Sequence, residues 1–383
     1  MQKTPWGLVL ALWGAGLGAA AQYGKFSVIF DQLPAAYPQA GAAIGFIVSV
    51  VGILGIFLGV AAGLLVARVR YRRAVVWALW AGAAISAFQA SLPPLPWMLL
   101  SRVLEGLSHL AIVVAVPTLI AQICVPKDRG LALTLWGTFF GVAFAVLAWG
   151  GLPLVAWRGI PALLLAHGGY MAAFAVVLGA CLKGLPDDAP AQPFSLAALM
   201  RDHVAIYRSP FIAAPAVGWL FYTFCFVSIL TVLPGYLAAD VRGLVMGAMP
   251  LVSIASSMTL GVVLMRYMSA IAVVLVGFAG SALAMSWLGV AAGLPAACLT
   301  LAATMGLIQG ASFAAVPQLN KTARAQAQAN GAMAQTGNIG NTLGTPVMAL
   351  AVGGMGYAGV PILAGVAFAL GACAHLALAK KRQ

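Results

Sequence analysis

Apolar segments of about 20 residues follow one another along almost the whole chain, and each is long enough to cross a membrane as a helix. We predict twelve such spans, near 6–30, 41–67, 74–92, 96–123, 130–152, 159–182, 210–236, 244–265, 269–290, 295–318, 331–353 and 357–379. Only 7% of the residues are charged, whereas a soluble globular domain has about 25%. The sequence therefore predicts an all-α, multi-pass membrane protein.

The basic residues are distributed unevenly between the predicted loops. With twelve spans, all but four of the 20 lysines and arginines fall on one side of the membrane, and the exceptions are Lys25, Arg102, Arg158 and Arg242. The positive-inside rule assigns the side rich in basic residues to the cytoplasm. We therefore predict that both the N and the C terminus are cytoplasmic.

Composition excludes several classes of protein. The net charge of +13 does not indicate nucleic-acid binding, because the basic residues lie in short groups and form no reading motif. The five cysteines match neither a disulfide framework nor a metal-binding spacing. The sequence also has no nucleotide-binding loop, no nucleophile motif and no large hydrophilic domain. It predicts a monomeric, non-enzymatic protein without a cofactor, whose partners are the lipid bilayer and a small-molecule substrate.

The two halves of the chain show a weak internal repeat. Four matches occur in order at offsets of 198 to 204 residues: Leu33-Pro34 with Leu233-Pro234, Gly63–Arg68 with Gly261–Arg266, Glu105-Gly106 with Gln309-Gly310, and Gly130 with Gly331. A parallel six-helix duplication builds transporters whose site lies between two bundles. We predict pseudo-symmetric six-helix bundles at 1–182 and 210–383, joined by a cytoplasmic loop at 183–209. Because residues 1–24 pair with the seventh span, we expect them to be retained although they resemble a signal peptide.

The segment Gly63–Arg73 resembles the signature loop of the major facilitator superfamily, roughly G-x-x-x-D-R-x-G-R-R. The positions that fit are Gly63, Arg68, Arg72 and Arg73. Ala67 replaces the acid of the pattern, and Arg70 replaces its second glycine. Arg102–Gly106 is similar to the family's fourth-helix R-x-x-x-G pattern, and Trp157-Arg158 to the element before its sixth helix. The resemblance implies a twelve-helix transporter that works by alternating access.

Four segments are similar to a small bacterial branch of that superfamily: Ser101–His109, Pro117–Ala121, Leu135–Gly141 and Phe221–Thr223. Its known members import riboflavin, or copper for cytochrome oxidase assembly. The resemblance implies an importer of a small organic solute in the bacterial inner membrane, with riboflavin as the first candidate. Copper is the alternative, although the seventh span has no methionine, and its weak candidate ligands are Met246 and Met249. A receptor or assembly factor that no longer transports is a further alternative, which the loss of the acid at Ala67 favours.

One acidic residue, Glu105, lies inside a long apolar segment. Arg102, Glu105 and His109 share one helical face, because they are spaced i, i+3 and i+7. Ionisable groups at membrane depth usually line a cavity or a proton path. Two interpretations are open. Arg102 and Glu105 form a structural ion pair, because an unpaired charge in hydrocarbon costs several kcal/mol, or Glu105 takes a proton in each transport cycle with His109 as the relay.

The family resemblance implies that the first, fourth, seventh and tenth helices line the cavity, with the fifth and eleventh beside them. The candidate substrate-binding residues on these helices are Gln22, Lys25, Arg102, Glu105, His109, Trp136, Phe140, Tyr222, Gln309, Asn338 and Asn341. Aromatic planes with amide donors and acceptors suit a flat heterocycle with polar edges. Lys25 either extends to the membrane interface or orients a polar or anionic group at the entrance. His167 and Met171 have the i, i+4 spacing of two copper ligands on one helix, but the resemblance places their helix at the periphery.

Overall fold

The computed structural model describes residues 3–183 and 203–383, apart from the side chains at 42, 60–65, 67, 68, 323 and 324. Within that part, the chain is helical and contains no strand, which confirms the predicted all-α class. Eight described stretches are long and apolar enough to cross a membrane, and the stretch Ile44–Gly59 is apolar but shorter. Most of the loop predicted at 183–209 lies outside the described residues, as do the side chains of Ala67 and Arg68.

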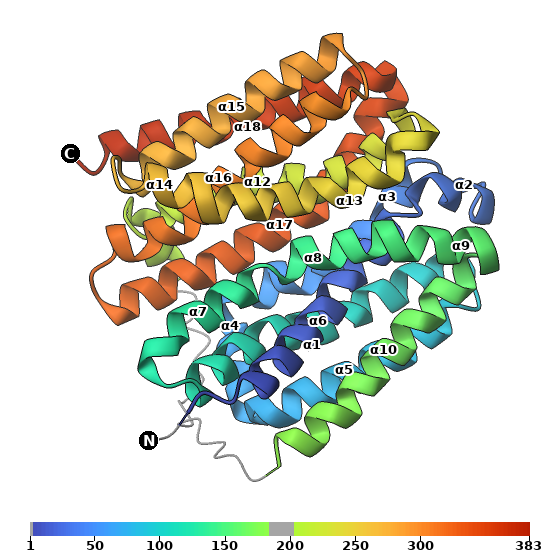
Figure 1. Ribbon diagram of the computed structural model, residues 1–383, viewed down its shortest axis with the longest axis horizontal. Helices are drawn as coiled ribbons and strands as arrows, with labels where there is room; N and C mark the ends of the chain where they lie inside the picture. Colours follow the sequence, from blue (N-terminus) through green and yellow to red (C-terminus); the bar gives the residue numbers. More distant parts are fainter. Residues whose placement is uncertain (1–2, 184–202) are drawn as a thin grey trace. The chain divides into compact units, whose positions relative to one another are not determined.

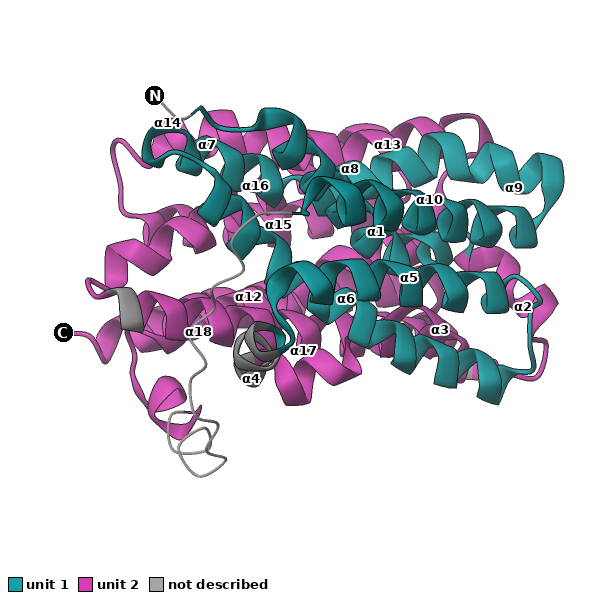
Figure 2. Cartoon of the chain, turned by 90° about the horizontal axis from the view of Figure 1, so that it is seen from below, with its two compact units in different colours: residues 1–29, 61–194 teal, residues 30–60, 195–383 magenta. Residues whose placement is uncertain are grey.

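The chain divides into two compact units (Figure 2). Unit 1 comprises residues 1–29 and 61–194, and unit 2 comprises residues 30–60 and 195–383. Helix α4 (Ile53–Val69) contains the boundary between residues 60 and 61. The other described elements of unit 1 are α1 (Trp6–Ser27), α5 (Tyr71–Gln89), α6 (Leu95–Ile123), α7 (Pro126–Gly137), α8 (Phe139–Val146), η4 (Leu147–Gly151), α9 (Leu152–Arg158) and α10 (Ile160–Cys181) (Figure 1).

Unit 2 begins with short elements before the boundary in α4: η1 (Phe30–Gln32), α2 (Leu33–Ala36), η2 (Gly41–Ala43), α3 (Ile44–Ser49) and η3 (Val50–Gly52). Its longer helices are α12 (Ala213–Val232), α13 (Ala239–Ser256), α15 (Ala270–Val290), α16 (Pro295–Leu319), α17 (Ala323–Met355) and α18 (Gly359–Lys380). They are joined by the short elements η5 (Leu233–Tyr236), η6 (Ser257–Gly261), α14 (Val262–Leu264) and η7 (Gly356–Ala358).

Glycine and proline explain several helix boundaries. Gly159 separates α9 from α10 with a φ of 79°, a conformation that favours glycine because it has no Cβ atom. Helix α6 begins after Pro94, and Pro96 lies in its first turn, where the missing N–H has no intrahelical partner to lose. Arg70, just before α5, has a φ of 73°. This left-handed position is the one at which the signature loop has its second glycine.

Several predicted spans differ from the observed helices, and two of them show why. The span predicted at 41–67 is not one helix, because η2 and η3 interrupt it on either side of α3. Helix α17 begins at Ala323 rather than near 331, and the Thr322 hydroxyl caps it by accepting a hydrogen bond from the Ala325 N–H at 3.2 Å. The first turns of α17 are polar, so a search for apolar segments does not detect them.

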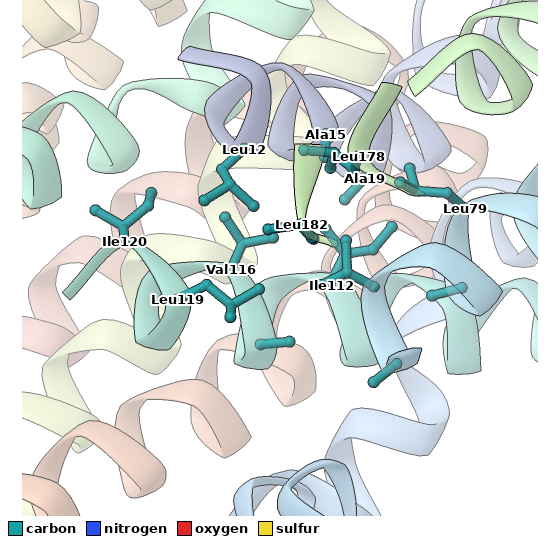
Figure 3. Close-up of a cluster of buried hydrophobic side chains, with 14 of the residues drawn as sticks. Leu12, Ala15, Ala19, Leu79, Ile112, Val116, Leu119, Ile120, Leu178 and Leu182 are labelled. Carbon is teal, nitrogen blue, oxygen red and sulfur yellow. The ribbon is translucent and has the colours of Figure 1, made fainter. Parts of the chain in front are cut away.

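An apolar core joins the helices of unit 1 (Figure 3). Leu12 and Ala15 of α1 pack with Leu79 of α5, Ile112 of α6 and Leu178 of α10, and all of these residues are almost completely buried. In a bilayer, such contacts stabilise helix association through close van der Waals packing, because the lipid tails are as apolar as leucine. This packing fixes α1, α5, α6 and α10 against one another, and the polar residues about two to three turns away on these helices meet as a result.

Helices α12 and α17 of unit 2 pack through small residues. A Cβ atom at Gly340 of α17 would lie 2.5 Å from the carbonyl oxygen of Leu220 in α12, and one at Gly344 would clash with the backbone of Phe224. Glycine at these positions therefore allows the two backbones to approach closely. The close approach also brings the polar residues of α17 beside the aromatic residues of α12.

Candidate functional site

A buried cluster of charged side chains lies where α1, α5, α6 and α10 of unit 1 meet. Lys25 Nζ on α1 lies 2.6 Å from Glu105 Oε1 on α6, and both side chains are 0% exposed. Arg102, one turn before Glu105 on α6, is also fully buried and donates from Nη1 to Glu105 Oε2. The ion pair considered for Arg102 and Glu105 is therefore present, but it belongs to a group of three charges.

The position of Lys25 corrects one expectation from the sequence. Its side chain does not extend to the membrane interface, because it is completely buried and donates to Glu105 and to Ser86 Oγ, the latter at 2.7 Å. Lys25 lies in the last turn of α1, and snorkelling is common near the end of a membrane helix. A carboxylate in a low-dielectric core attracts an ammonium group much more strongly than one in water does, and this attraction accounts for the inward direction.

Helix α5 supplies the neutral polar residues of the cluster. Gln89 Nε2 donates to Glu105 Oε2 at 2.9 Å and to Ser101 Oγ at 3.1 Å. The carboxylate of Glu105 therefore accepts hydrogen bonds from an ammonium, a guanidinium and an amide. Charged hydrogen bonds of this kind are about twice as strong as neutral ones, so the surroundings of Glu105 stabilise its ionised form.

His167 of α10 completes the cluster, although the family resemblance implied that its helix lies at the periphery. Its Nδ1 lies 2.7 Å from Ser86 Oγ and 3.4 Å from Lys25 Nζ, and its Nε2 lies 3.0 Å from the carbonyl oxygen of Gly18. A carbonyl oxygen accepts only, so Nε2 carries a hydrogen and Nδ1 is the acceptor in the neutral ring. The signal for His167 was present in the sequence, because a histidine inside an apolar segment needs a polar partner.

Gln22 and His109 lie beside this cluster but are held by separate hydrogen bonds. Gln22 Nε2 donates to Ser108 Oγ at 2.9 Å, and Ser108 donates to the carbonyl of Ala78 at 2.7 Å. His109 Nδ1 donates to the carbonyl oxygen of Ala19 at 3.0 Å. His109 and Glu105 are thus both buried on α6, yet the imidazole bonds to the backbone of α1 rather than to the carboxylate.

The predicted aromatic residues of unit 1 lie next to His109. The Tyr23 ring meets the His109 ring edge-on, with centroids 5.1 Å apart, and Phe140 lies 5.8 Å from Tyr23 and 6.4 Å from His109. Trp136 stacks on Phe139 at 4.3 Å. The structure therefore brings Phe140 together with the polar residues of α1 and α6, whereas Trp136 is linked to them through Phe139.

Unit 2 combines stacked aromatic rings with neutral polar groups. Tyr222 of α12 is almost completely buried and stacks on Trp219 with the centroids 4.7 Å apart. On the neighbouring α17, Asn338 donates to the carbonyl of Ala334 at 2.8 Å. Asn341 Oδ1 and the hydroxyl group of Thr345 are buried without a hydrogen-bond partner among the described residues. Buried polar atoms are usually paired, so these groups are available to a polar ligand.

The remaining candidates also lie in unit 2. Gln309 is partly exposed on α16, and Met246 and Met249 are buried on α13. Met249 lines a cavity of about 10 Å³ together with Met305, Ser253 and Phe226, which is room for about one water molecule. Among residues 3–183 and 203–383, as far as their side chains are described, no three His, Cys, Asp or Glu residues are arranged to hold a metal ion.

Comparison with known proteins gives a family and a fold. The profile of the Major Facilitator Superfamily matches residues 8–345. The structure is similar to a bacterial homolog of the human lysosomal transporter Spinster in its inward-facing, occupied conformation, with a TM-score of 0.80, 13% identity and coverage of 98% of this chain and 97% of that chain. For the inward-facing, unoccupied conformation the TM-score is 0.71, with 13% identity and coverage of 97% and 93%. No curated protein matches the sequence.

Proposed function

The chain belongs to the major facilitator superfamily, and on this premise we propose that it imports a small organic solute across a bacterial inner membrane by alternating access. In this proposal, twelve helices form two six-helix bundles, 1–182 and 210–383, with both termini in the cytoplasm. The bias of lysine and arginine between alternate loops supports the orientation.

One observation carries the proposal for transport: three charged side chains, Lys25, Arg102 and Glu105, are completely buried among apolar helices. Burying charges in this way costs several kcal/mol, and replacing a buried ion pair by apolar residues is often neutral or stabilising. Stability alone therefore does not account for the cluster. Charged groups inside membrane proteins usually mark pathways for substrates, ions or protons.

Riboflavin is the solute that we propose. A flat heterocycle needs an aromatic surface for stacking and neutral donors and acceptors for its edges. Unit 2 offers both side by side, because Trp219 and Tyr222 of α12 lie next to the helix that carries Asn341 and Thr345. A neutral polar site also suits a neutral vitamin better than a strongly charged solute.

The test is growth and uptake in a riboflavin auxotroph that cannot take up the vitamin. We expect the chain to restore growth at low external riboflavin, and we expect Tyr222→Leu and Asn341→Ala each to reduce uptake at least about tenfold, because each removes a stacking or hydrogen-bonding partner. Matched controls are Tyr267→Leu, which changes an exposed tyrosine, and Asn330→Ala, which changes an exposed amide on the same α17. Absence of rescue with the protein present in the membrane would refute riboflavin import.

Copper import is the second candidate, and the cavity lined by Met249 and Met305 favours it. Thioether sulfur is a soft ligand that suits Cu(I). If copper is the substrate, the chain restores cytochrome oxidase activity in a copper-uptake mutant, and Met249→Leu with Met305→Leu removes this effect. Met258→Leu is the control, because that methionine is exposed on η6. Purified protein that transports neither solute in proteoliposomes would instead support a receptor or assembly role.

A further inference from the structure

The charged cluster of unit 1 has one more positive charge than negative charge. Lys25 and Arg102 share a single carboxylate, Glu105, and all three side chains are 0% exposed. The other titratable groups that face them are Tyr23 of α1, His109 of α6 and His167 of α10, while α5 contributes the neutral Ser86 and Gln89. An unbalanced buried charge is costly, so a site of this kind is suited to releasing a proton or to accepting an anion.

Glu105 is poorly placed to take up a proton. The side chains that bond to its two oxygens are Lys25, Arg102 and Gln89, and each of them donates a hydrogen. A protonated carboxyl group would direct its own O–H at Lys25 or Arg102, unless the Gln89 amide turned over to present Oε1, which has no hydrogen-bond partner among the described residues. Among the described residues, Glu105 is the one carboxylate bonded to Lys25 and Arg102, so its protonation would also remove the negative charge that these two buried cations share. The geometry therefore favours a carboxylate that stays ionised as a fixed counter-charge.

Lys25, Ser86 and His167, in contrast, keep their short hydrogen bonds with or without one proton. As an ammonium, Lys25 donates to Glu105 Oε1 at 2.6 Å, to Ser86 Oγ at 2.7 Å and toward His167 Nδ1 at 3.4 Å. As a neutral amine, it keeps two hydrogens, which are enough to donate to Glu105 and Ser86 while the Ser86 hydroxyl donates to His167 Nδ1 at 2.7 Å. The cluster then has no net charge and loses only the long contact between Lys25 and His167.

We propose that Lys25, Ser86 and His167 form the proton-binding site of this chain, with Glu105 and Arg102 as fixed charges that hold it in place. The proton passes from Lys25 Nζ to Ser86 Oγ while the Ser86 hydroxyl proton passes to His167 Nδ1, which leaves a neutral amine and an imidazolium that still donates from Nε2 to Gly18. The proposal rests on the proposed transport function for its purpose, because a transporter uses such a site to couple solute movement to protons. It does not depend on the identity of the solute.

Thermal unfolding of the purified full chain at neutral pH tests this assignment without any substrate. Lys25→Met imitates the deprotonated site and leaves Glu105 paired with Arg102 and Gln89, so we expect its Tm to equal the wild-type value or to exceed it by about 2–5 °C. Glu105→Gln imitates a protonated carboxyl group and leaves two buried cations, so we expect its Tm to fall by more than about 5 °C. The double variant Lys25→Met/Glu105→Gln should recover part of this loss even if Glu105→Gln alone does not fold.

The controls are Lys127→Met and Asp240→Asn, which remove a charge at exposed positions and should leave Tm unchanged. The opposite order of stability, with Glu105→Gln at the wild-type Tm and Lys25→Met strongly destabilised, would show that Glu105 carries the proton. A wild-type Tm that rises with added chloride or acetate, and does so only when Lys25 is present, would show that an anion balances the cluster. Either result overturns the proposal and leaves the riboflavin test untouched.

Nitrogen-15 NMR of the histidines provides a second measurement. The sequence has four histidines, and His167→Gln identifies the signals of the one in the cluster, with His203→Gln as the matched control. We expect the His167 signals to show the Nε2–H tautomer and to shift with pH, because the ring shares a proton with Lys25. Lys25→Met should abolish that shift. Signals of His167 that respond to pH equally in both proteins would contradict a shared proton.

Discussion

The described buried polar side chains of unit 1 include three charged ones, Lys25, Arg102 and Glu105, whereas those of unit 2 include no Asp, Glu, Lys or Arg. The internal repeat pairs Glu105 with Gln309, and the offset of 200 residues that relates Leu33-Pro34 to Leu233-Pro234 also relates Lys25 to Cys225. The difference therefore occurs at corresponding positions. Cys225 is completely buried, and its thiol lies 3.9 Å from the carbonyl oxygen of Ala364. Under our proposals, the charged half of the duplicated architecture exchanges a proton and the neutral half binds the solute.

The largest effect on folding is expected when a positive charge like that of Lys25 is introduced at the corresponding position of unit 2. Cys225→Lys places an ammonium group in a buried position, and the described acidic residues of unit 2, Asp31 and Asp240, are both exposed. An unpaired buried charge costs several kcal/mol or more, so we expect no folded, monodisperse protein by fluorescence-detected size-exclusion chromatography. Cys181→Lys is the control, because that cysteine is exposed at the end of α10. Equal elution profiles of the two variants would mean that unit 2 tolerates charge as unit 1 does.

An intermediate effect is expected from removing one buried hydroxyl group in each unit. Ser86 of unit 1 bonds to a charged Lys25, and Ser281 of unit 2 bonds to the neutral Thr304 at 3.0 Å. Because hydrogen bonds to charged groups contribute about 1.5–3 kcal/mol and neutral ones about 0.5–1.5 kcal/mol, Ser86→Ala should lower the free energy of unfolding more than Ser281→Ala. Both serines are 0% exposed, so the pair is matched in burial. Denaturant titration in detergent measures the two changes, and equal losses would argue against a charged site.

The sequence predicted the class of fold because membrane helices reveal themselves by length and apolar composition. The predicted helix bounds were wrong where a helix has a polar end or is interrupted. The first turns of α17 carry polar residues such as Gln326 and Asn330, and the helix there depends on the Thr322 cap rather than on hydrophobicity. The amino-acid composition does not indicate the interruption at Val50–Gly52, because the residues on both sides are apolar.

The contacts within the candidate site could be predicted only between residues that share one helix. The spacing of Arg102 and Glu105 placed them on one face of α6, and they do bond to each other. The partners contributed by other helices, Lys25, Ser86 and His167, depend on how α1, α5 and α10 pack. No periodicity within a single segment contains that information. Counting the charges within the apolar segments would have predicted such partners, because two buried cations and one carboxylate indicate that further polar groups must be near.

The smallest effect is expected for the ion pair of unit 2, between Arg242 on α13 and Asp31 on η1. Its atoms are 3.4 Å apart, and the side chains are 32% and 44% exposed, so water and salt screen the attraction. Exposed pairs contribute about 0–1 kcal/mol, and we expect Asp31→Asn to change the free energy of unfolding by less than about 1 kcal/mol and less still at high salt. Glu105→Gln should cost several times more at any salt concentration, because no solvent reaches its partners. A salt-independent loss on Asp31→Asn as large as that of Glu105→Gln would mean that burial does not distinguish the two ion pairs.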